Sequence, residues 1–260
     1  MAILQCGEFQ LDLSAPRVMA IINLTDNSFS GDGHANQLDQ ALRHVDRALA
    51  EGADMLDIGA ESTRPGALPV SAEQELERLL PLLERLRGCP VPISIDTLKP
   101  VVMRAVIAAG AHMINDVNGF REEDAIAAVA GSQAGLCVMH MQGEPRTMQA
   151  APSYADVCVE VRAFLDGQVE ALLAAGVDRQ RIVLDPGFGF GKTLAHDLAL
   201  LRNLDSFRAE GYPVLAGMSR KTMIGQITGK EVGERVAGSL AAALIAVRNG
   251  ARIVRVHDVA

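Results

Sequence analysis

Tryptophan is absent from the sequence, and aromatic residues are few, with 7 Phe and 2 Tyr among 260 residues. Positive charge is also in short supply, because 32 Asp and Glu outnumber 24 Lys and Arg and give a formal net charge of −8. A broad nucleic-acid surface needs basic stripes or aromatic side chains that stack on bases. We therefore expect no nucleic-acid partner, although a local group of Arg and Lys could still bind a small polyanion.

Cysteine and long apolar runs are scarce as well. The four cysteines are widely spaced and form neither a Cys-x-x-Cys pair nor a zinc-ligand pattern. No apolar run approaches the ~20 residues that a membrane span needs, and the first residues lack the basic-then-apolar layout of a signal peptide. These features predict a cytoplasmic protein with reduced thiols and no membrane partner.

What the sequence does contain is a regular alternation of short apolar runs and amphipathic segments. Eight runs rich in Val, Ile, Leu or Met fit strands and are too short for helices. They cover residues 18–24, 55–59, 93–96, 113–117, 136–141, 182–185, 214–218 and 253–257. Helical periods lie between them, at residues 38–51, 72–87, 100–109, 122–130, 155–175, 197–209 and 233–249.

Eight predicted strands that alternate with helical segments, at this length, predict one α/β domain, residues 1–260, folded as a (β/α)8 TIM barrel. An open doubly wound sheet is the alternative. The barrel is favoured because nearly every predicted strand ends in a polar residue, whereas an open sheet gathers function at one switch point. These strand-end residues are Asn23, Asp57, Asp96, Asn115, His140, Asp185, Ser219 and Arg255.

The sequence stops at Ala260, directly after the eighth predicted strand. This leaves no residues for the eighth helix of a complete barrel. We expect the final C-terminal helix to be missing because the sequence is truncated, with a covering of the outer face by something else as the alternative.

The stretch PGFGFGKT at residues 186–193 is the most conspicuous glycine-rich motif. It misses the P-loop spacing by one residue, because Pro186 stands where that motif needs its first glycine. It also lacks the third glycine of a dinucleotide-binding fingerprint, where Lys192 stands. From spacing alone, a flexible ligand-binding loop and an ordinary turn both stay open.

Two carboxylates end apolar strands, Asp96 in SIDT and Asp185 in LDPG. Each alone could merely cap the following helix. With Asn115 and Lys221 at the same rim, they form a convergent set of donors and acceptors suited to the edge of a flat heterocycle. Carboxylates placed there would also stabilise positive charge that develops on such a ring during reaction.

A second set is cationic and comprises Arg64, Arg255 and His257, with Arg220 close to the seventh strand. Converging Arg and His side chains near the last two strands match the phosphate site of many barrels. Surface ion pairs are the alternative. Ser219 precedes a segment whose backbone N–H groups could help it hold a carboxylate.

Met139 and His140 end the fifth predicted strand, in VMHMQG. A histidine there is as consistent with a structural role as with that of a catalytic base. Met139 is more consistent with an apolar wall of the site.

Taken in order, these strand-end segments resemble the bacterial dihydropteroate synthase family of pterin-binding enzymes. The matching runs are Asn-x-Thr-x-x-Ser-Phe-Ser at 23–30, ESTRPG at 61–66, SIDT at 94–97, INDV at 114–117, VMHMQG at 138–143, LDPGFGFGK at 184–192, GMSRK at 217–221 and RVHDV at 255–259. Folate-dependent corrinoid methyltransferases share only part of this set, and ESTRPG, GMSRK and RVHDV favour the synthases.

The resemblance implies a reaction of folate biosynthesis, in which 6-hydroxymethyl-7,8-dihydropterin diphosphate is joined to p-aminobenzoate and pyrophosphate is released with the help of Mg²⁺. It implies pterin contacts at Asp96, Asn115, Met139, Asp185, Gly189, Phe190 and Lys221. It implies diphosphate contacts at Asn23, Arg64, Arg255 and His257, with Asn23 also on the metal side. It implies an aminobenzoate subsite at Phe29, Thr63, Pro65 and Ser219. Asp96, Asp185, Lys221 and Arg64 would be catalytic, and a homodimer is usual.

An aromatic amine is a weak nucleophile, so we expect a dissociative substitution in which the diphosphate leaves first. Mg²⁺ and the cationic set would neutralise the leaving group, while Asp96 and Asp185 offset the charge of the resulting methylene cation. No side-chain nucleophile is required.

Residues 25–29 depart from the family pattern, because Thr-Asp-Asn-Ser-Phe stands where the family usually has Thr-Pro-Asp-Ser-Phe. Two other functions therefore stay open. A non-catalytic pterin-binding paralogue would not release pyrophosphate in response to p-aminobenzoate. A methyltransferase pterin domain would bind folate, and the cationic set argues against it.

Overall fold

The computed structural model of the protein describes residues 3–24, 34–61, 69–208 and 211–260. Within these ranges, eight parallel strands form one sheet in the order β8-β7-β6-β5-β4-β3-β10-β9. They are β3 (Arg17–Asn23), β4 (Met55–Gly59), β5 (Ile93–Asp96), β6 (Met113–Asp116), β7 (Gly135–Met139), β8 (Ile182–Asp185), β9 (Leu215–Ala216) and β10 (Ile253–Val256). A parallel bridge between Leu184 and Val214 joins the two edges, so the sheet forms a nearly closed barrel. The predicted barrel is confirmed.

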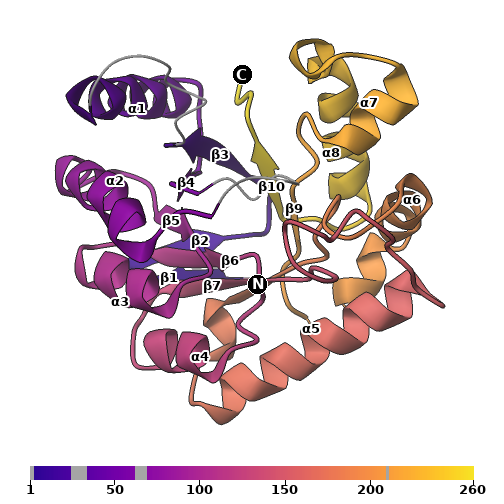
Figure 1. Cartoon of the computed structure of the whole chain (residues 1–260), viewed down its shortest axis with the longest axis horizontal. Coiled ribbons are helices and arrows are strands. Elements are labelled where there is room, and N and C mark those ends of the chain that lie inside the picture. The colour runs from indigo at the N-terminus through magenta and orange to yellow at the C-terminus, as the bar shows by residue number, and fades with distance from the viewer. Residues whose placement is uncertain (1–2, 25–33, 62–68, 209–210) are drawn as a thin grey trace.

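Helices surround the strands and follow one another around the outside of the barrel (Figure 1). They are α1 (His34–Ala50), α2 (Ala72–Arg85), α3 (Pro100–Ala108), α4 (Glu123–Ala130), α5 (Val157–Ala174), α6 (Leu194–Arg202), α7 (Thr222–Thr228) and α8 (Val236–Arg248). The predicted helix at 197–209 divides into α6 and the 3₁₀ turn η3 (Leu204–Arg208). Among these α-helices, only α7 lacks a counterpart among the predicted helices, because its seven residues contain a glycine and four β-branched side chains of modest helix propensity.

Local sequence signals set the start of α2. Ser71 Oγ accepts a hydrogen bond from the Gln74 N–H at 3.2 Å, and Gln74 Oε1 accepts one from the Ser71 N–H at 3.1 Å. This reciprocal capping box satisfies two N–H groups that the helix itself leaves unpaired. It fixes where the connection from β4 ends, and that connection carries the ESTRPG motif.

A β-hairpin that the apolar pattern did not predict precedes the barrel. Strands β1 (Ile3–Cys6) and β2 (Phe9–Asp12) pair in antiparallel fashion across a two-residue turn, where Gly7 has a φ of +59°. A two-residue turn with glycine first is a hairpin signal, but Gln5 and Gln10 interrupt the apolar residues of the two strands. Side chains of the hairpin segment pack against one apolar layer inside the barrel, formed by Met19, Met55, Met113, Cys137, Val183, Leu215 and Ile253.

Alternation along the strands separates two layers inside the barrel. Successive side chains of a strand point to opposite faces, so the residues two positions after the apolar layer also point inward. Thus Met55 is followed by Asp57, Met113 by Asn115, Val183 by Asp185 and Ile253 by Arg255. The interior is therefore apolar towards the amino ends of the strands and polar towards their carboxyl ends.

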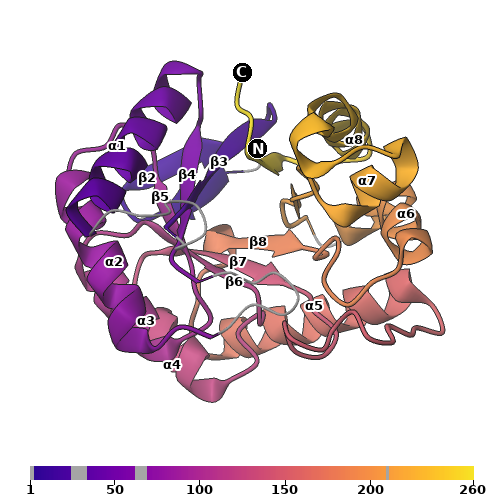
Figure 2. The same ribbon diagram turned by 45° about the horizontal axis from the view of Figure 1, so that its top comes forward.

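No helix follows β10 in residues 257–260, and the end of the chain lies between α1 and α8 in both ribbon views (Figures 1 and 2). The expected truncation of the sequence stays a prediction. Among the helices within the described ranges, none is long and apolar enough to cross a membrane.

Candidate active site

Polar side chains from separate strands meet at the carboxyl ends of the barrel. We call the following six residues the polar cluster: Asp57, Asp96, Asn115, Asp185, Lys221 and Arg255. Arg255 joins three of the strands, because its Nε lies 2.6 Å from Asp57 Oδ2 and its Nη2 lies 3.1 Å from Asp96 Oδ2. Asn115 Nδ2 donates to the same Asp57 Oδ2 at 3.2 Å. Asp96 and Asn115 of the predicted heterocycle set are thus linked through Arg255 and Asp57. Asp185 and Lys221 lie close enough to shift each other's pKa.

Burial and neighbouring charges shift the pKa values of these groups in opposite directions. Burial raises the pKa of Asp96 to about 7, against the lowering effect of Arg255. Burial also raises the pKa of Asp185, although Lys221 and the Gly187 N–H oppose it. Burial by itself would lower the pKa of Arg255, but Asp57 and Asp96 hold it above its ordinary value. Groups shifted in this way by desolvation and by specific partners are typical of functional sites.

Lys221, the residue before α7, reaches the cluster from the loop after β9. Its Nζ donates to the carbonyl oxygen of Phe188 at 2.6 Å and lies 4.6 Å from the centre of the Phe190 ring. Burial lowers its pKa to about 8, an effect that Asp185 opposes. A lysine with this pKa still carries its positive charge at neutral pH and can donate to a carbonyl or phosphate oxygen.

Three buried polar atoms on barrel strands have no hydrogen-bond partner in the part of the chain that the structure describes. They are Asp57 Oδ1, Asn115 Oδ1 and Ser94 Oγ. An unpaired buried polar group costs about 1–3 kcal/mol, so its persistence points to a ligand or to function. Two of these atoms are pure acceptors and suit the N–H and amino groups along one edge of a heterocycle.

The cationic set is divided between different partners. The His257 N–H donates to Ser219 Oγ at 3.1 Å, and the ring Nδ1 of His257 lies 3.1 Å from the same oxygen. This contact places a predicted diphosphate residue beside a predicted aminobenzoate residue. Arg220 instead pairs with Asp258, with its Nε 2.8 Å from Oδ2. For Arg220 the ion-pair alternative is therefore the one that the structure supports.

Asn23 ends β3, half-buried and in register with Gly59 of β4. The described residues contain no group of three or more His, Cys, Asp and Glu that could hold a metal ion. Mg²⁺ commonly takes one or two protein oxygens and completes its shell with water and substrate phosphates. A single amide oxygen at Asn23 fits a Mg²⁺ ion that is bound together with a diphosphate.

An apolar wall lies next to the polar cluster. Met139 at the end of β7 packs with Val117, Met141 and Met148, and Phe190 packs against this group. Gly189 lies in the same loop as Phe190, and its N–H donates to Asp197 Oδ1 at 2.9 Å. The apolar role predicted for Met139 agrees with this packing.

Four predicted site residues lie outside the described ranges. They are Phe29, Thr63, Arg64 and Pro65. Residues 25–29, which depart from the family pattern, also lie outside the described ranges, whereas the nearby Asn23 lies within them. Of the predicted aminobenzoate subsite, the structure therefore describes Ser219 alone.

Two buried residues, Asp57 and Lys192, make contacts that the sequence pattern did not predict. Asp57 was predicted only as a strand-end residue, yet it contacts both Arg255 and Asn115 and is fully buried. The available signal was a lone carboxylate in the otherwise apolar strand MLDIG. In the sequence, Lys192 served only to exclude a dinucleotide-binding fingerprint. In the structure it is buried, and its Nζ lies next to the ring of His140.

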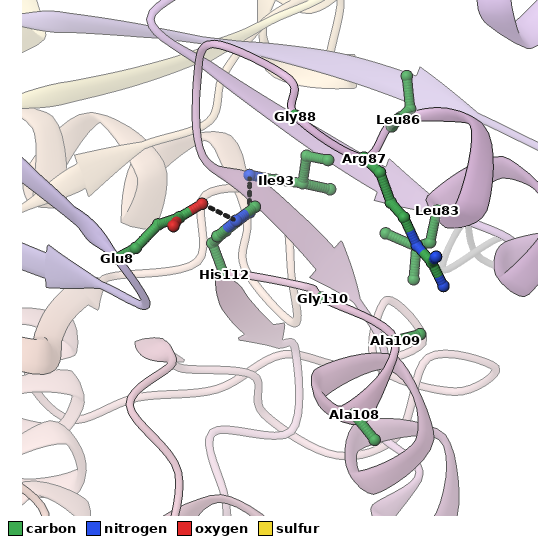
Figure 3. A pocket seen from close by; sticks show the side chains of 10 residues that line it. All are labelled: Glu8, Leu83, Leu86, Arg87, Gly88, Ile93, Ala108, Ala109, Gly110 and His112. Atoms are coloured by element: carbon green, nitrogen blue, oxygen red, sulfur yellow. Dashed lines mark hydrogen bonds and ion pairs between the residues drawn. The ribbon is translucent and has the colours of Figure 1, made fainter.

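A hollow of about 360 Å³ lies at the opposite, amino-terminal end of β5 and β6 (Figure 3). The ring of His112 is already engaged there, since its Nδ1 accepts from the Ile93 N–H at 3.1 Å and its Nε2 lies 3.7 Å from Glu8 Oε1. Burial lowers the pKa of His112. Barrel enzymes carry their catalytic residues at the other face, so the polar cluster is the candidate active site.

Known proteins share both the sequence and the fold. The profile of the family described as "Pterin binding enzyme" matches residues 19–257. The dihydropteroate synthase of Haemophilus influenzae is 48% identical over 251 residues, which cover 96% of this chain and 91% of that protein. The crystal structure of Burkholderia cenocepacia dihydropteroate synthase complexed with 7,8-dihydropteroate is 54% identical, with a TM-score of 0.90 over 99% of this chain and 91% of the other. Xanthomonas albilineans dihydropteroate synthase with 4-aminobenzoic acid is 48% identical, with a TM-score of 0.93 over 99% and 93%.

Proposed function

Because this chain belongs to the dihydropteroate synthase family of pterin-binding enzymes, we propose that its polar cluster is where the two substrates of that family react. The activity is that of a transferase that produces 7,8-dihydropteroate in folate biosynthesis. The single observation that supports this site best is the convergence of Asp57 and Asp96 on Arg255, with Asn115 bonded to Asp57 and acceptor atoms left over.

The pterin ring lies, in this proposal, against the polar cluster. Asp96, Asn115 and Asp185 accept hydrogen bonds from its ring N–H and amino groups, and Lys221 donates to its carbonyl oxygen. Met139, Gly189 and Phe190 border the ring on its apolar side. The convergence of the acceptors, the buried oxygen of Asn115 and the apolar group around Met139 support this assignment.

The diphosphate lies nearer the rim, where Asn23, Arg64, Arg255 and His257 contact it. Within the described residues, the hydrogen bonds of Arg255 use its Nε and Nη2, and a guanidinium has five N–H donors in all. Arg255 therefore keeps donors for phosphate oxygens. Asn23 Oδ1 would hold Mg²⁺, which supplies a Lewis acid that neutralises charge on the diphosphate.

The p-aminobenzoate lies in a subsite formed by Phe29, Thr63, Pro65 and Ser219. Ser219 supports this placement because its hydroxyl contacts both the backbone and the ring of His257. The aminobenzoate is thereby adjacent to the leaving diphosphate, as an incoming nucleophile must be. The same structural neighbourhood therefore serves both substrates.

The side chains of this protein then perform a dissociative substitution. Arg64, Arg255 and His257 stabilise the departing diphosphate, and the C–O bond breaks before the weakly nucleophilic amine attacks. The amine nitrogen then forms a C–N bond to the methylene carbon, and its proton passes to the released pyrophosphate or to water. Asp96 and Asp185 lie in a desolvated environment, where a carboxylate stabilises developing positive charge on the ring more strongly than in water. Lys221 keeps the ring in place through its carbonyl oxygen.

We also propose that two copies of the chain form a homodimer through α8. Val236, Leu240 and Leu244 are spaced by four residues, so they share one face of this helix. Their side chains are 43%, 60% and 58% exposed. A contiguous apolar face of this kind favours association with a second protein surface.

Two further proposals concern the chain as a whole. Residues 1–260 act as one catalytic domain, because the barrel strands run from β3 near the start to β10 near the end. The reaction takes place in the cytoplasm, a compartment that suits the free thiols of Cys6, Cys89, Cys137 and Cys158.

Release of pyrophosphate that depends on p-aminobenzoate tests the proposed function. The purified chain is given the pterin diphosphate and Mg²⁺, with and without p-aminobenzoate. The proposed enzyme releases pyrophosphate and forms dihydropteroate only with both substrates, and Asp185→Asn strongly reduces the rate. Tight pterin binding without turnover would support the non-catalytic paralogue instead, and unchanged kinetics in Asp185→Asn would remove that residue from the site.

A further inference from the structure

Lys192 follows the loop of residues 186–191, which we call the glycine loop, and only 4% of its surface is exposed. Lysine is almost never fully buried unless its ammonium group is paired. The contacts of Lys192 are unusual because they are made mainly with backbone carbonyl groups rather than with a carboxylate. Burying a lysine side chain costs free energy, and the contacts of Lys192 compensate for it and show what the side chain holds in place.

The Nζ of Lys192 connects both ends of a turn to the neighbouring strand. It donates to the carbonyl oxygens of Gly187 at 2.9 Å and Phe190 at 3.0 Å, and the carbonyl oxygen of His140 lies at 3.4 Å. The ring Nδ1 of His140 lies 3.0 Å from the same nitrogen. Burial lowers the pKa of His140 to about 3, so its ring is neutral and Nδ1 can accept. The turn is thus tied to the residue that follows β7.

The other side of the same turn holds Lys221. The Phe190 N–H donates to the Gly187 carbonyl at 3.1 Å and closes the turn at residues 187–190. Inside that turn, the carbonyl of Phe188 accepts from Lys221 Nζ, and the Phe190 ring lies below the same nitrogen. Two lysines, the buried Lys192 and the half-buried Lys221, therefore contact one four-residue turn, one from the side of His140 and the other from the polar cluster.

We propose that Lys192 is a positioning residue that fixes the turn at residues 187–190, so that Phe188 and Phe190 hold the ammonium group of Lys221 in the polar cluster. Lys192 does not contact substrate in this arrangement. The inference rests on the proposed function, because it concerns the pterin-binding role given there to Lys221. It goes beyond that function by assigning a reason for the lysine that ends the motif.

The experiment is a double-mutant cycle that measures binding of the pterin diphosphate by titration calorimetry in the absence of p-aminobenzoate. Lys192→Met and Lys221→Met are made singly and together. Each single substitution should weaken binding by about 10-fold or more, because each removes the hydrogen bonds that a lysine Nζ donates to backbone carbonyl groups of the glycine loop. The double variant should bind no more weakly than Lys221→Met alone, because Lys192 acts through Lys221. Independent, multiplicative losses would overturn the proposal.

Steady-state kinetics separates positioning from general loosening of the fold. Lys192→Met should raise KM for the pterin diphosphate and leave KM for p-aminobenzoate unchanged. Equal changes in both would indicate a merely structural role and overturn the proposal. Lys230→Met removes an exposed lysine whose Nζ lies 3.9 Å from Glu234, and this control should bind and react like the wild type.

If Lys192→Met does not fold, Lys192→Gln takes its place. Lys192→Gln keeps N–H donors for a carbonyl oxygen, and it should show a smaller increase in KM for the pterin diphosphate than Lys192→Met, with the same specificity for that substrate. An unchanged KM in a folded Lys192→Met protein, or a larger increase in Lys192→Gln than in Lys192→Met, contradicts the inference. Failure of the wild type to bind the pterin diphosphate would instead contradict the proposed function, so the two failures are distinguishable.

Discussion

At the scale of single residues, the charge state of Lys221 makes the proposed pterin site sensitive to pH. Burial lowers its pKa to about 8, so the group is charged below that pH and neutral above it. We predict that kcat/KM for the pterin diphosphate falls as the pH rises above about 8, because the donor to the ring carbonyl then loses its charge. The measurement is kcat/KM across a pH range that brackets this value.

Lys221→Arg is the matched variant for this prediction. Arginine stays protonated in proteins, so the alkaline fall in kcat/KM should disappear, even though its planar fork lowers activity at every pH. An alkaline limb at the same pH in Lys221→Arg would show that another group titrates there.

Asp57 orients Arg255, and a second prediction follows from this contact. Asp57→Asn keeps the shape of the side chain and removes the charge that faces Arg255 Nε at 2.6 Å. Because hydrogen bonds to charged groups contribute ~1.5–3 kcal/mol, we expect kcat/KM to fall by roughly 10- to 100-fold. Steady-state kinetics with both substrates checks it.

Asp54→Asn is the control for Asp57→Asn. Asp54 pairs with Arg17 at 3.0 Å, but this pair lies at the amino-terminal ends of β3 and β4, away from the polar cluster. Its loss should lower the free energy of unfolding slightly and leave kcat/KM unchanged. Similar kinetic losses in both variants would mean that Asp57 has no special relation to the site.

At the scale of elements, the glycine loop is defined by close backbone contact. Gly187 has a φ of +71°, and a Cβ added there would collide with the carbonyl oxygen of His140. A Cβ at Gly191, which has a φ of +64°, would lie 2.6 Å from the carbonyl oxygen of Gln142. These glycines therefore allow the loop to pack against the segment after β7.

Gly187→Ala should distort this element. The left-handed backbone conformation alone costs a non-glycine residue of order 1–3 kcal/mol, and the collision with His140 adds to it. We expect a lower free energy of unfolding and a higher KM for the pterin diphosphate, measured by denaturant titration and steady-state kinetics.

Gly167→Ala, unlike Gly187→Ala, should stabilise the protein. Gly167 lies inside α5, and no atom lies within 4 Å of the Cβ that alanine would add. Replacing it should raise the free energy of unfolding by roughly 0.5–1 kcal/mol through helix propensity, without a kinetic effect. Stabilisation by Gly187→Ala, or destabilisation by Gly167→Ala, would contradict this account of the two glycines.

At the scale of the whole molecule, the exposed apolar face of α8 leads to a prediction about association. Leu240→Glu combined with Leu244→Glu places two carboxylates on the face proposed for the homodimer. The variant should have half the wild-type molar mass by light scattering after gel filtration, because buried unpaired charges oppose association. Val159→Glu alters an equally exposed apolar residue on α5 and should leave the mass unchanged. A monomeric wild type would refute the proposed dimer.

The sequence pattern did not predict β1, β2 and α7, because the local signals for these elements are weak. All eight barrel strands were predicted, since each is an apolar run, but the four-residue strands β1 and β2 have no comparable pattern. The seven residues of α7 carry too few turns for a helical period. Both are held by packing against the rest of the molecule, and tertiary contacts of that kind leave no periodic trace in the sequence.

The sequence by itself determined the order of strands and helices, and it determined which polar residues end the strands. Those features depend on periods of 2 and 3.6 residues, which neighbouring residues encode. Only the tertiary structure decided the partners of these residues: Arg255 with Asp57 across 198 positions, Lys192 with His140 across 52, and Arg220 with Asp258 rather than with the site. The reason is that pairing inside a barrel depends on strand register and side-chain direction, and several carboxylates on one rim are equivalent until the strands are placed.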